Sequence, residues 1–425
     1  MARVLYLSPL PPAPTGIATY SAAVLGELRA SGFTKRHRVE APWPIRGRIE
    51  EQARAADLPV YHLGNNLDFH RDIYALAARH PGLVVLHDLA LDDLGGALLA
   101  VGDPLGGPTR VEAMDAAYRL DPPSVGLDEP LRVPWCAYVV RRSRGVIVHS
   151  EFGRRYLKAF GSLTPVFVVP HPAVETPRAV RRAERRAARL RNGFPGRVLV
   201  GVLGDLGRAK AIGEVLEAVA RVGPPAHLVV VGRRIPMFDV EQEVVEPSGH
   251  RDRVTVVPDV SDRDFLTWLA ACDVVVNLRH PHRGEVSGTV VRALQAGKPT
   301  VVPAEGTYLD WPEDAVVRVP AGPPGPDDLA AALGPLVRDP SRRAAVGGRA
   351  RAHIGALERG HATARGYAEA VEATLRLIRD PGRDALSRWA GSLTDLGASP
   401  EMVRRGLGAG YAESLAELAE GPVTA

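Results

Sequence analysis

The sequence has 425 residues, a net charge of +4, 45% hydrophobic residues and two cysteines, Cys136 and Cys272. This length predicts two or three domains, each large enough to bury its own core. The cysteines lie far apart in apolar surroundings, which excludes a disulfide-stapled module and predicts buried thiols in a reducing compartment. The small net charge does not separate the two halves of the chain, so we predict no nucleic-acid partner.

Short apolar runs alternate with amphipathic helical stretches, a pattern typical of parallel sheets covered by helices. In the first half, the predicted strands are 3–8, 60–63, 83–87, 145–150 and 166–170. In the second half, they are 197–203, 227–232, 253–258, 273–278, 299–302 and 315–319. The chain is therefore predicted to be an α/β protein with two doubly wound domains in series. Because no apolar run reaches the length of a membrane span, we expect a cytoplasmic protein.

A basic segment separates the two halves. Its arginines recur at steps of mostly three and four residues, which places them on one side of a helix: Arg178, Arg181, Arg182, Arg185, Arg186, Arg189 and Arg191. The pattern is typical of a solvated helix, and the alternative is a contact with anionic lipid or an acidic substrate.

Polar and small residues follow several predicted strands of the first half. Thr15 is a natural N-cap for the helix after the first strand, and Gly16 lets a ligand approach the backbone there. A proline-stiffened turn explains this loop equally well. Other polar residues end the later strands: Asn65, His87, Asp88 and His149. Because the carboxyl ends of parallel strands line the ligand crevice of an open α/β sheet, these residues are candidates for a site.

The second half offers two loops suited to an anion. The loop after strand 197–203 carries Arg208 and Lys210, which could neutralise a pair of phosphates, although two solvated cations on a glycine-rich turn explain it equally well. Glu285 precedes a predicted helix whose first amides could also bind an anionic group; the residues are Ser287, Gly288 and Thr289. An acid in this turn favours hydroxyl binding, and the alternative is a capped helix with a surface glutamate.

The order of these motifs resembles the retaining GT-B glycosyltransferases of family four. The resemblance covers nearly the whole chain, and its most specific part is the block from Glu285 to Pro299. It implies two Rossmann-like domains that face a cleft, and a C-terminal helix that crosses back to the N-terminal domain. We therefore expect an acceptor domain over 1–172, a basic linker over 173–195, a nucleotide-sugar donor domain over 196–380, and C-terminal helices over 381–425 that pack on the first domain.

The resemblance also implies roles for single residues. Lys210 and the amides of 287–289 would bind the donor diphosphate with Arg208 as a further candidate, and Glu285 would bind hydroxyls of the donor sugar. Gly16 would approach the donor phosphate or the acceptor, and His87 would contact the transferred sugar. His87, Asp88 and Glu285 are the catalytic candidates. The acceptor-side candidates are Thr15, Asn65 and His149.

The implied reaction is same-face transfer of the sugar, in which the leaving phosphate itself takes the acceptor's proton. It needs no protein nucleophile, metal or cofactor, because stabilising the departing diphosphate is the main task. The co-substrate would be a nucleoside-diphosphate sugar. The acceptor would be a glycan, a lipid-linked molecule or a small molecule that carries a hydroxyl group.

Two positions depart from the family's pattern. Arg292 stands where a second glutamate, which binds the ribose, is expected, and Asp205 replaces an arginine five residues before Lys210. The nucleotide base therefore stays open. Two other kinds of function also stay open: a sugar-nucleotide epimerase or phosphorylase of the same fold, and a non-catalytic protein that binds sugar nucleotides.

Overall fold

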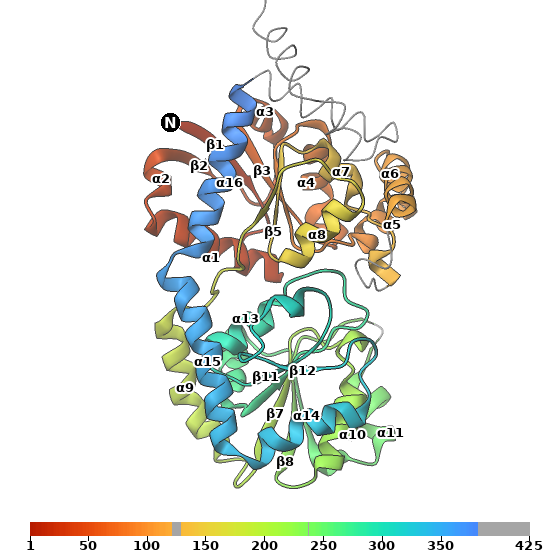
Figure 1. Cartoon of the computed structure of the whole chain (residues 1–425), viewed down its shortest axis with the longest axis vertical. Coiled ribbons are helices and arrows are strands. Elements are labelled where there is room, and N and C mark those ends of the chain that lie inside the picture. Colours follow the sequence, from red (N-terminus) through yellow and green to blue (C-terminus); the bar gives the residue numbers. More distant parts are fainter. Residues whose placement is uncertain (121–128, 237, 381–425) are drawn as a thin grey trace, which may run out of the picture. The chain divides into compact units, whose positions relative to one another are not determined.

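Successive side chains of a strand point to opposite faces of its sheet, and in the central strands both sets are apolar. Helices therefore cover both faces of the two sheets. The computed structural model describes residues 1–120, 129–236 and 238–380 (Figure 1). It divides into two compact units. Among the described residues, unit 1 contains those of Met1–Pro170, Arg283–Val286 and 361–380, and unit 2 contains those of His171–His282 and Ser287–Gly360.

Within the described residues, unit 1 contains a six-stranded parallel sheet of order β2-β1-β3-β4-β5-β6. The strands are β1 (Ala2–Leu7), β2 (His37–Glu40), β3 (Leu58–Leu63), β4 (Leu83–Leu86), β5 (Gly145–Val148) and β6 (Val166–Val168). Its helices are α1 (Gly16–Ala30), α2 (Phe33–Arg36), α3 (Ile49–Ala55), α4 (Leu67–Arg79), α5 (Asp92–Ala100), α6 (Gly106–Arg119), α7 (Ala137–Arg142), α8 (Glu151–Ala159) and α16 (Ala362–Arg379).

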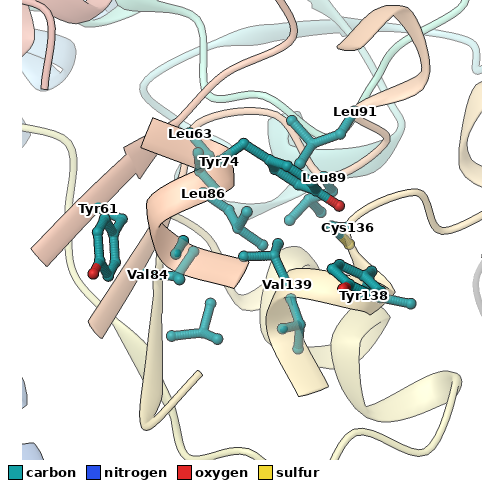
Figure 2. Close-up of a cluster of buried hydrophobic side chains, with 14 of the residues drawn as sticks. Tyr61, Leu63, Tyr74, Val84, Leu86, Leu89, Leu91, Cys136, Tyr138 and Val139 are labelled. Carbon is teal, nitrogen blue, oxygen red and sulfur yellow. The ribbon is translucent and has the colours of Figure 1, made fainter. Parts of the chain in front are cut away.

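The two faces of this sheet bury different cores. Leu5 and Leu7 of β1 belong to the cluster that α4, α5, α7 and α8 cover. Figure 2 shows part of it, with Tyr74 of α4 and Val139 of α7 near Leu86. The alternate positions of β1 belong to a second cluster, which α1 and α16 cover. This alternation is the period-two pattern of a strand that is buried on both sides.

Unit 2 contains a second parallel sheet, of order β12-β11-β10-β7-β8-β9 in the described part of the chain. The strands are β7 (Val198–Leu203), β8 (Ala226–Gly232), β9 (Val254–Pro258), β10 (Val274–Val276), β11 (Thr300–Pro303) and β12 (Val317–Val319). Its helices are α9 (Pro177–Arg191), α10 (Ile212–Val222), α11 (Glu246–Ser248), α12 (Asp262–Ala271), α13 (Gly288–Gln295), α14 (Pro326–Arg338) and α15 (Pro340–Arg359). The prediction of two doubly wound domains is confirmed.

The structure draws the boundaries between segments differently from the sequence prediction. Residues 173–195 were expected to form a linker, but α9 is part of unit 2, where Ala187 is buried in the core beside α12. The chain returns to unit 1 already at His361, and α16 completes the core of that unit. The helices predicted over 381–425 lie outside the described residues. Among the described helices, none combines the length and the apolar character needed to cross a membrane.

Candidate functional site

Each sheet has one topological switch point, where the strand order reverses and the crossovers diverge. In unit 1 this point lies between β1 and β3, and in unit 2 it lies between β7 and β10. Ligands of open α/β sheets bind outside the carboxyl ends of the strands at such points. The Thr15–Gly16 loop follows β1, and the Lys210 loop follows β7. The topology thus brings the strongest sequence candidates to the switch points.

In unit 2, Lys210 and Thr289 both lie close to Gly204. Gly204 follows β7 with a φ of +108°, and a Cβ atom built on it would lie 3.3 Å from both Lys210 Nζ and Thr289 Oγ1. Glycine is required there, because other residues are strained at this φ and the two polar groups fill the space. The carboxyl end of β7 therefore brings an ammonium group and the first turn of α13 together.

Lys210 is held in this position by burial and by a hydrogen bond to the main chain. Its side chain is 4% exposed, on a short 3₁₀ turn, Arg208–Lys210. Its ammonium group donates to the carbonyl oxygen of Leu203, at 2.7 Å. A buried ammonium is stable only with polar partners, so this cation suits a site that receives an anion.

The first turn of α13 supplies amide donors beside Lys210. Ser287 is its N-cap and its Oγ accepts from the amide of Val290, so the amides of Gly288 and Thr289 have no partner inside the helix. The first turn contains no acidic residue. Together with the helix dipole, these donors form a suitable place for a phosphate group.

The other charged candidates of unit 2 are engaged with protein partners. The Arg208 guanidinium pairs with Glu243 and lies 4.9 Å from the Phe238 ring centroid. Asp205, at the position of the expected arginine, accepts from Arg233 Nε at 3.1 Å and from Nη2 at 2.9 Å. The guanidinium beside Asp205 therefore comes from Arg233, which follows β8. Sequence spacing does not reveal this pair, because the two residues follow different strands.

Arg292, at the position of the expected ribose glutamate, forms an ion pair with Glu175. The Arg292 Nε to Glu175 Oε1 distance is 3.2 Å, and both side chains are mostly buried. Burial raises the pKa of the Glu175 carboxyl, and Arg292 opposes that shift. The segment that precedes α9 is therefore tied to α13.

Glu285 lies in Arg283–Val286, the short segment that groups with unit 1. It is half-buried, and its Oε2 accepts from the amide of Arg283 at 2.8 Å. This contact closes a tight turn around Gly284, whose φ is +77°.

In unit 1, Gly64 brings Asp88 close to the Gly16 loop. A Cβ atom at Gly64 would lie 2.4 Å from Ile17 Cδ1 and 3.4 Å from Asp88 Oδ2, so only glycine fits between them. Thr15 caps α1 by accepting from the Ile17 amide at 3.3 Å. Gly16, the first residue of that helix, has no atom within 4 Å of its Cβ position. The start of α1 is therefore open to a ligand.

Asn65 plays a structural part in this region. Its amide group donates to Asp92 Oδ1 at 2.8 Å and to Asp93 Oδ2 at 3.0 Å, and its Oδ1 accepts from the Leu94 amide at 2.9 Å. Its backbone amide donates to Asp88 Oδ2 at 3.0 Å. The side chain thus closes the start of α5, which leaves it little capacity for an acceptor molecule.

His87 stands in a cluster of aromatic rings and imidazoles. Its ring centroid lies 5.3 Å from that of His149 and 4.6 Å from that of Tyr20. Its Nε2 lies 3.1 Å from Nδ1 of His62, a residue with no exposed surface. His149 is oriented by its Nδ1, which is 2.9 Å from the carbonyl oxygen of Val169. The sequence analysis did not single out His62, because it lies within β3, one residue before the end of the strand, and its contact with His87 joins two different strands.

Within the described residues, no group of three or more His, Cys, Asp or Glu side chains is arranged to hold a metal ion. Both cysteines are buried free thiols. Burial raises the pKa of each to about 12. The sites described above therefore consist of one lysine, backbone amides, imidazoles and carboxylates.

Comparison with known proteins agrees with this arrangement. Residues 184–353 match the family described as glycosyl transferases, group 1. This stretch includes Lys210 and the whole of α13, and the prediction of a glycosyltransferase is confirmed at the level of this domain. No curated protein sequence matches the chain.

Several solved structures share the fold. Anabaena HepE in complex with UDP and glucose is 16% identical, with a TM-score of 0.57 over 88% of this chain and 100% of that one. Sucrose-phosphate synthase from Thermosynechococcus elongatus is 16% identical, with a TM-score of 0.61 over 86% and 98%. WaaG, a glycosyltransferase involved in lipopolysaccharide biosynthesis, is 15% identical, with a TM-score of 0.56 over 87% and 99%. At these identities the likeness shows the fold, which is GT-B.

Proposed function

We propose that this chain is a retaining glycosyltransferase that moves a sugar from a nucleoside-diphosphate sugar to a hydroxyl group of an acceptor. The observation that carries the proposal is that Lys210 and the first turn of α13 both lie close to Gly204, inside the glycosyl transferases group 1 match. An ammonium group and two helix amides fit the two phosphates of the donor. They stabilise the negative charge that develops when the diphosphate leaves.

Residues of unit 1, which include Glu285, take the remaining roles in this proposal. Glu285 binds hydroxyls of the donor sugar, His87 and Asp88 contact the transferred group, and the open start of α1 at Gly16 accepts a phosphate or the acceptor. The leaving phosphate takes the acceptor's proton on the face from which it departs. No metal ion or cofactor enters this reaction, so chelation by EDTA should leave the rate of transfer unchanged.

The first experiment is a thermal-shift panel of UDP, GDP, ADP and their glucose conjugates. UDP heads the panel, because HepE of the same fold was solved with UDP and with UDP-glucose. A ligand at 100 times its Kd stabilises a protein by about 2.7 kcal/mol, which is readily measured as a rise in Tm. The base that gives the largest rise identifies the donor nucleotide.

The matching variant is Lys210→Ala, with the exposed Lys158→Ala as the control. Loss of one preorganised donor to a developing charge lowers kcat by about 100-fold to 1,000-fold. We therefore expect Lys210→Ala to lose transfer by this factor and Lys158→Ala to keep it. Equal transfer rates in the two variants would show that Lys210 does not bind the donor diphosphate.

Two results would favour the alternatives. A nucleotide that stabilises the protein without donor hydrolysis or transfer in either wild type or Lys210→Ala indicates a non-catalytic binding protein. Conversion of the sugar in the nucleotide sugar, without an acceptor, indicates an epimerase. The anomeric configuration of the product, read by NMR, tests retention directly.

A further inference from the structure

The buried His62 forms a hydrogen bond with His87, and this bond determines which nitrogen of each ring carries a proton. His62 Nδ1 and His87 Nε2 are 3.1 Å apart, and the two rings stack with centroids 5.4 Å apart at 29°. One of these two nitrogens must donate and the other must accept. The direction of this hydrogen bond depends on the second nitrogen of His62.

That second nitrogen, Nε2, is buried and has no hydrogen-bond partner among the described residues. A proton on Nε2 would leave a buried N–H donor unsatisfied. A proton on Nδ1 instead leaves Nε2 as a buried acceptor without a donor. Orphaned buried donors are rarer in proteins than under-satisfied acceptors, so the proton belongs on Nδ1. His62 then donates through Nδ1 to Nε2 of His87.

A doubly protonated His62 is disfavoured by its surroundings. The ring has no exposed surface, and the groups that face it are the Tyr6, Tyr20 and Tyr367 rings and the imidazoles of His87 and His149. Burial lowers the pKa of His62 well below its usual value, and the nearby His149 and His70 lower it further. No carboxylate is among these contacts, so nothing there compensates a positive charge.

We propose that His62 is a positioning residue that holds His87 in the neutral form protonated on Nδ1. Nε2 of His87 is then occupied as an acceptor, and Nδ1–H is the donor that His87 offers. This inference rests on the proposed function in one respect, which is that His87 contacts the transferred group. It deepens that function, because it makes His87 a hydrogen-bond donor to a sugar or phosphate oxygen and excludes a role as general base through Nε2.

The tautomer can be tested without any substrate, by ¹⁵N-edited NMR of the imidazole rings in the full chain. In wild type we expect the proton of His87 on Nδ1 and an unprotonated Nε2. In His62→Leu, which is similar in bulk but cannot donate, the two tautomers should exchange. Asparagine places an amide N–H near the position of Nδ1, so His62→Asn should restore the wild-type pattern at least in part. The control is His227→Leu, which removes a buried histidine of unit 2 and should leave the His87 signals unchanged.

Transfer kinetics supply the second readout. We expect His62→Leu to lower kcat with little change in KM, to shift the acid limb of the pH profile toward neutral pH, and to be partly rescued by asparagine. A wild-type His87 protonated on Nε2, or the same tautomer in His62→Leu, would overturn the inference. If the tautomer is as expected but His87→Ala transfers sugar at the wild-type rate, the inference about His62 survives and the proposed role of His87 fails.

Discussion

At the scale of single residues, His70 makes the free energy of unfolding of unit 1 depend on pH. Its ring is 1% exposed, and burial lowers its pKa to about 4. In the unfolded chain the pKa of histidine is about 6.5. Between these values the unfolded chain binds more protons than the folded one, so the free energy of unfolding falls as the pH falls.

We therefore predict that unit 1 loses up to ~1.4 kcal/mol of stability per pH unit from this residue between pH 6.5 and pH 4. His70→Asn should flatten the slope, because it removes the titrating ring and can still donate to the carbonyl oxygen of His62. Urea unfolding at several pH values measures it. The control is His361→Asn, which removes an exposed histidine in the left-handed region, where asparagine is tolerated. An unchanged slope in His70→Asn would contradict this account.

Gly16 tests whether the open start of α1 is part of the site. Gly16→Leu meets no protein atom within 4 Å of its Cβ, so the fold should be retained. If a substrate lies there, the added side chain should lower kcat/KM by about tenfold or more. Gly26→Leu is the matched control, since Gly26 lies on the same helix with equally open space. Equal kinetics in the two variants would show that no substrate lies at Gly16.

Local chemistry made some of these residues predictable from the sequence. Gly16 and Lys210 lie in the segments that connect β1 and β7 to the helices that follow them, where small and charged residues stand out against the apolar strands before them. Other contacts join distant parts of the chain, such as His62 with His87 and Arg292 with Glu175. No local pattern specifies such pairs, which is also why Asn65 looked like a candidate for the acceptor although it caps α5.

At the scale of secondary-structure elements, β7 depends on a residue without a side chain. A Cβ atom at Gly201 would lie 2.4 Å from Cys272 Sγ and 2.9 Å from Leu203 Cδ1. Gly201→Val should therefore destabilise unit 2 by about 1–3 kcal/mol or more through overpacking. The comparison is Gly213→Ala on α10, whose nearest new contact is an ordinary 3.8 Å; it should stabilise the helix by up to ~1 kcal/mol.

Chemical denaturation of both variants distinguishes these effects. Cys272→Ala removes the sulfur atom and should recover part of the loss in Gly201→Val. If the double variant is no more stable than Gly201→Val, contact with Cys272 is not the cause.

Long apolar strands were predictable, and one edge strand was not. The sequence predicts β7 and β8 nearly to their ends, because they are apolar except for His227 and are buried on both faces. β2 has the sequence HRVE and lies at the edge of its sheet, so it lacks the apolar run that marks a central strand. The arginines of α9 gave the helix correctly, but its burial beside α12 depends on Ala183 and Ala187, whose partners are far away in the sequence.

At the scale of the whole molecule, the stability of unit 1 depends on α16, which lies far from the rest of that unit in the sequence. Tyr367 is 1% exposed, and its hydroxyl lies 2.7 Å from the hydroxyl of Tyr20 on α1. Tyr367→Ala should lower the stability of unit 1 by about 3–5 kcal/mol, as other large-to-small aromatic substitutions do. Tyr367→Phe keeps the packing and should cost only about 1 kcal/mol for the lost hydrogen bond.

Hydrogen exchange resolved by residue measures both variants. The amides of β3 and β5, which α16 contacts, should lose protection in Tyr367→Ala, whereas those of β7 and β8 should not change. Equal loss in both sheets would show that the two units unfold together.

The return of the chain to unit 1 at His361 also affects the order in which the two units can complete their folding during synthesis. β6 leaves the ribosome well before α16, and at 5–20 residues per second the intervening residues take on the order of tens of seconds to make. During that time the part of the sheet face that α16 covers, which includes Val85 and Ile147, lacks this helix. The described strands of unit 2, β7 to β12, are all made within this interval, before α16 begins. The half of the protein that is translated first is therefore the half that finishes folding last, and nascent chains should recruit chaperones through this uncovered face.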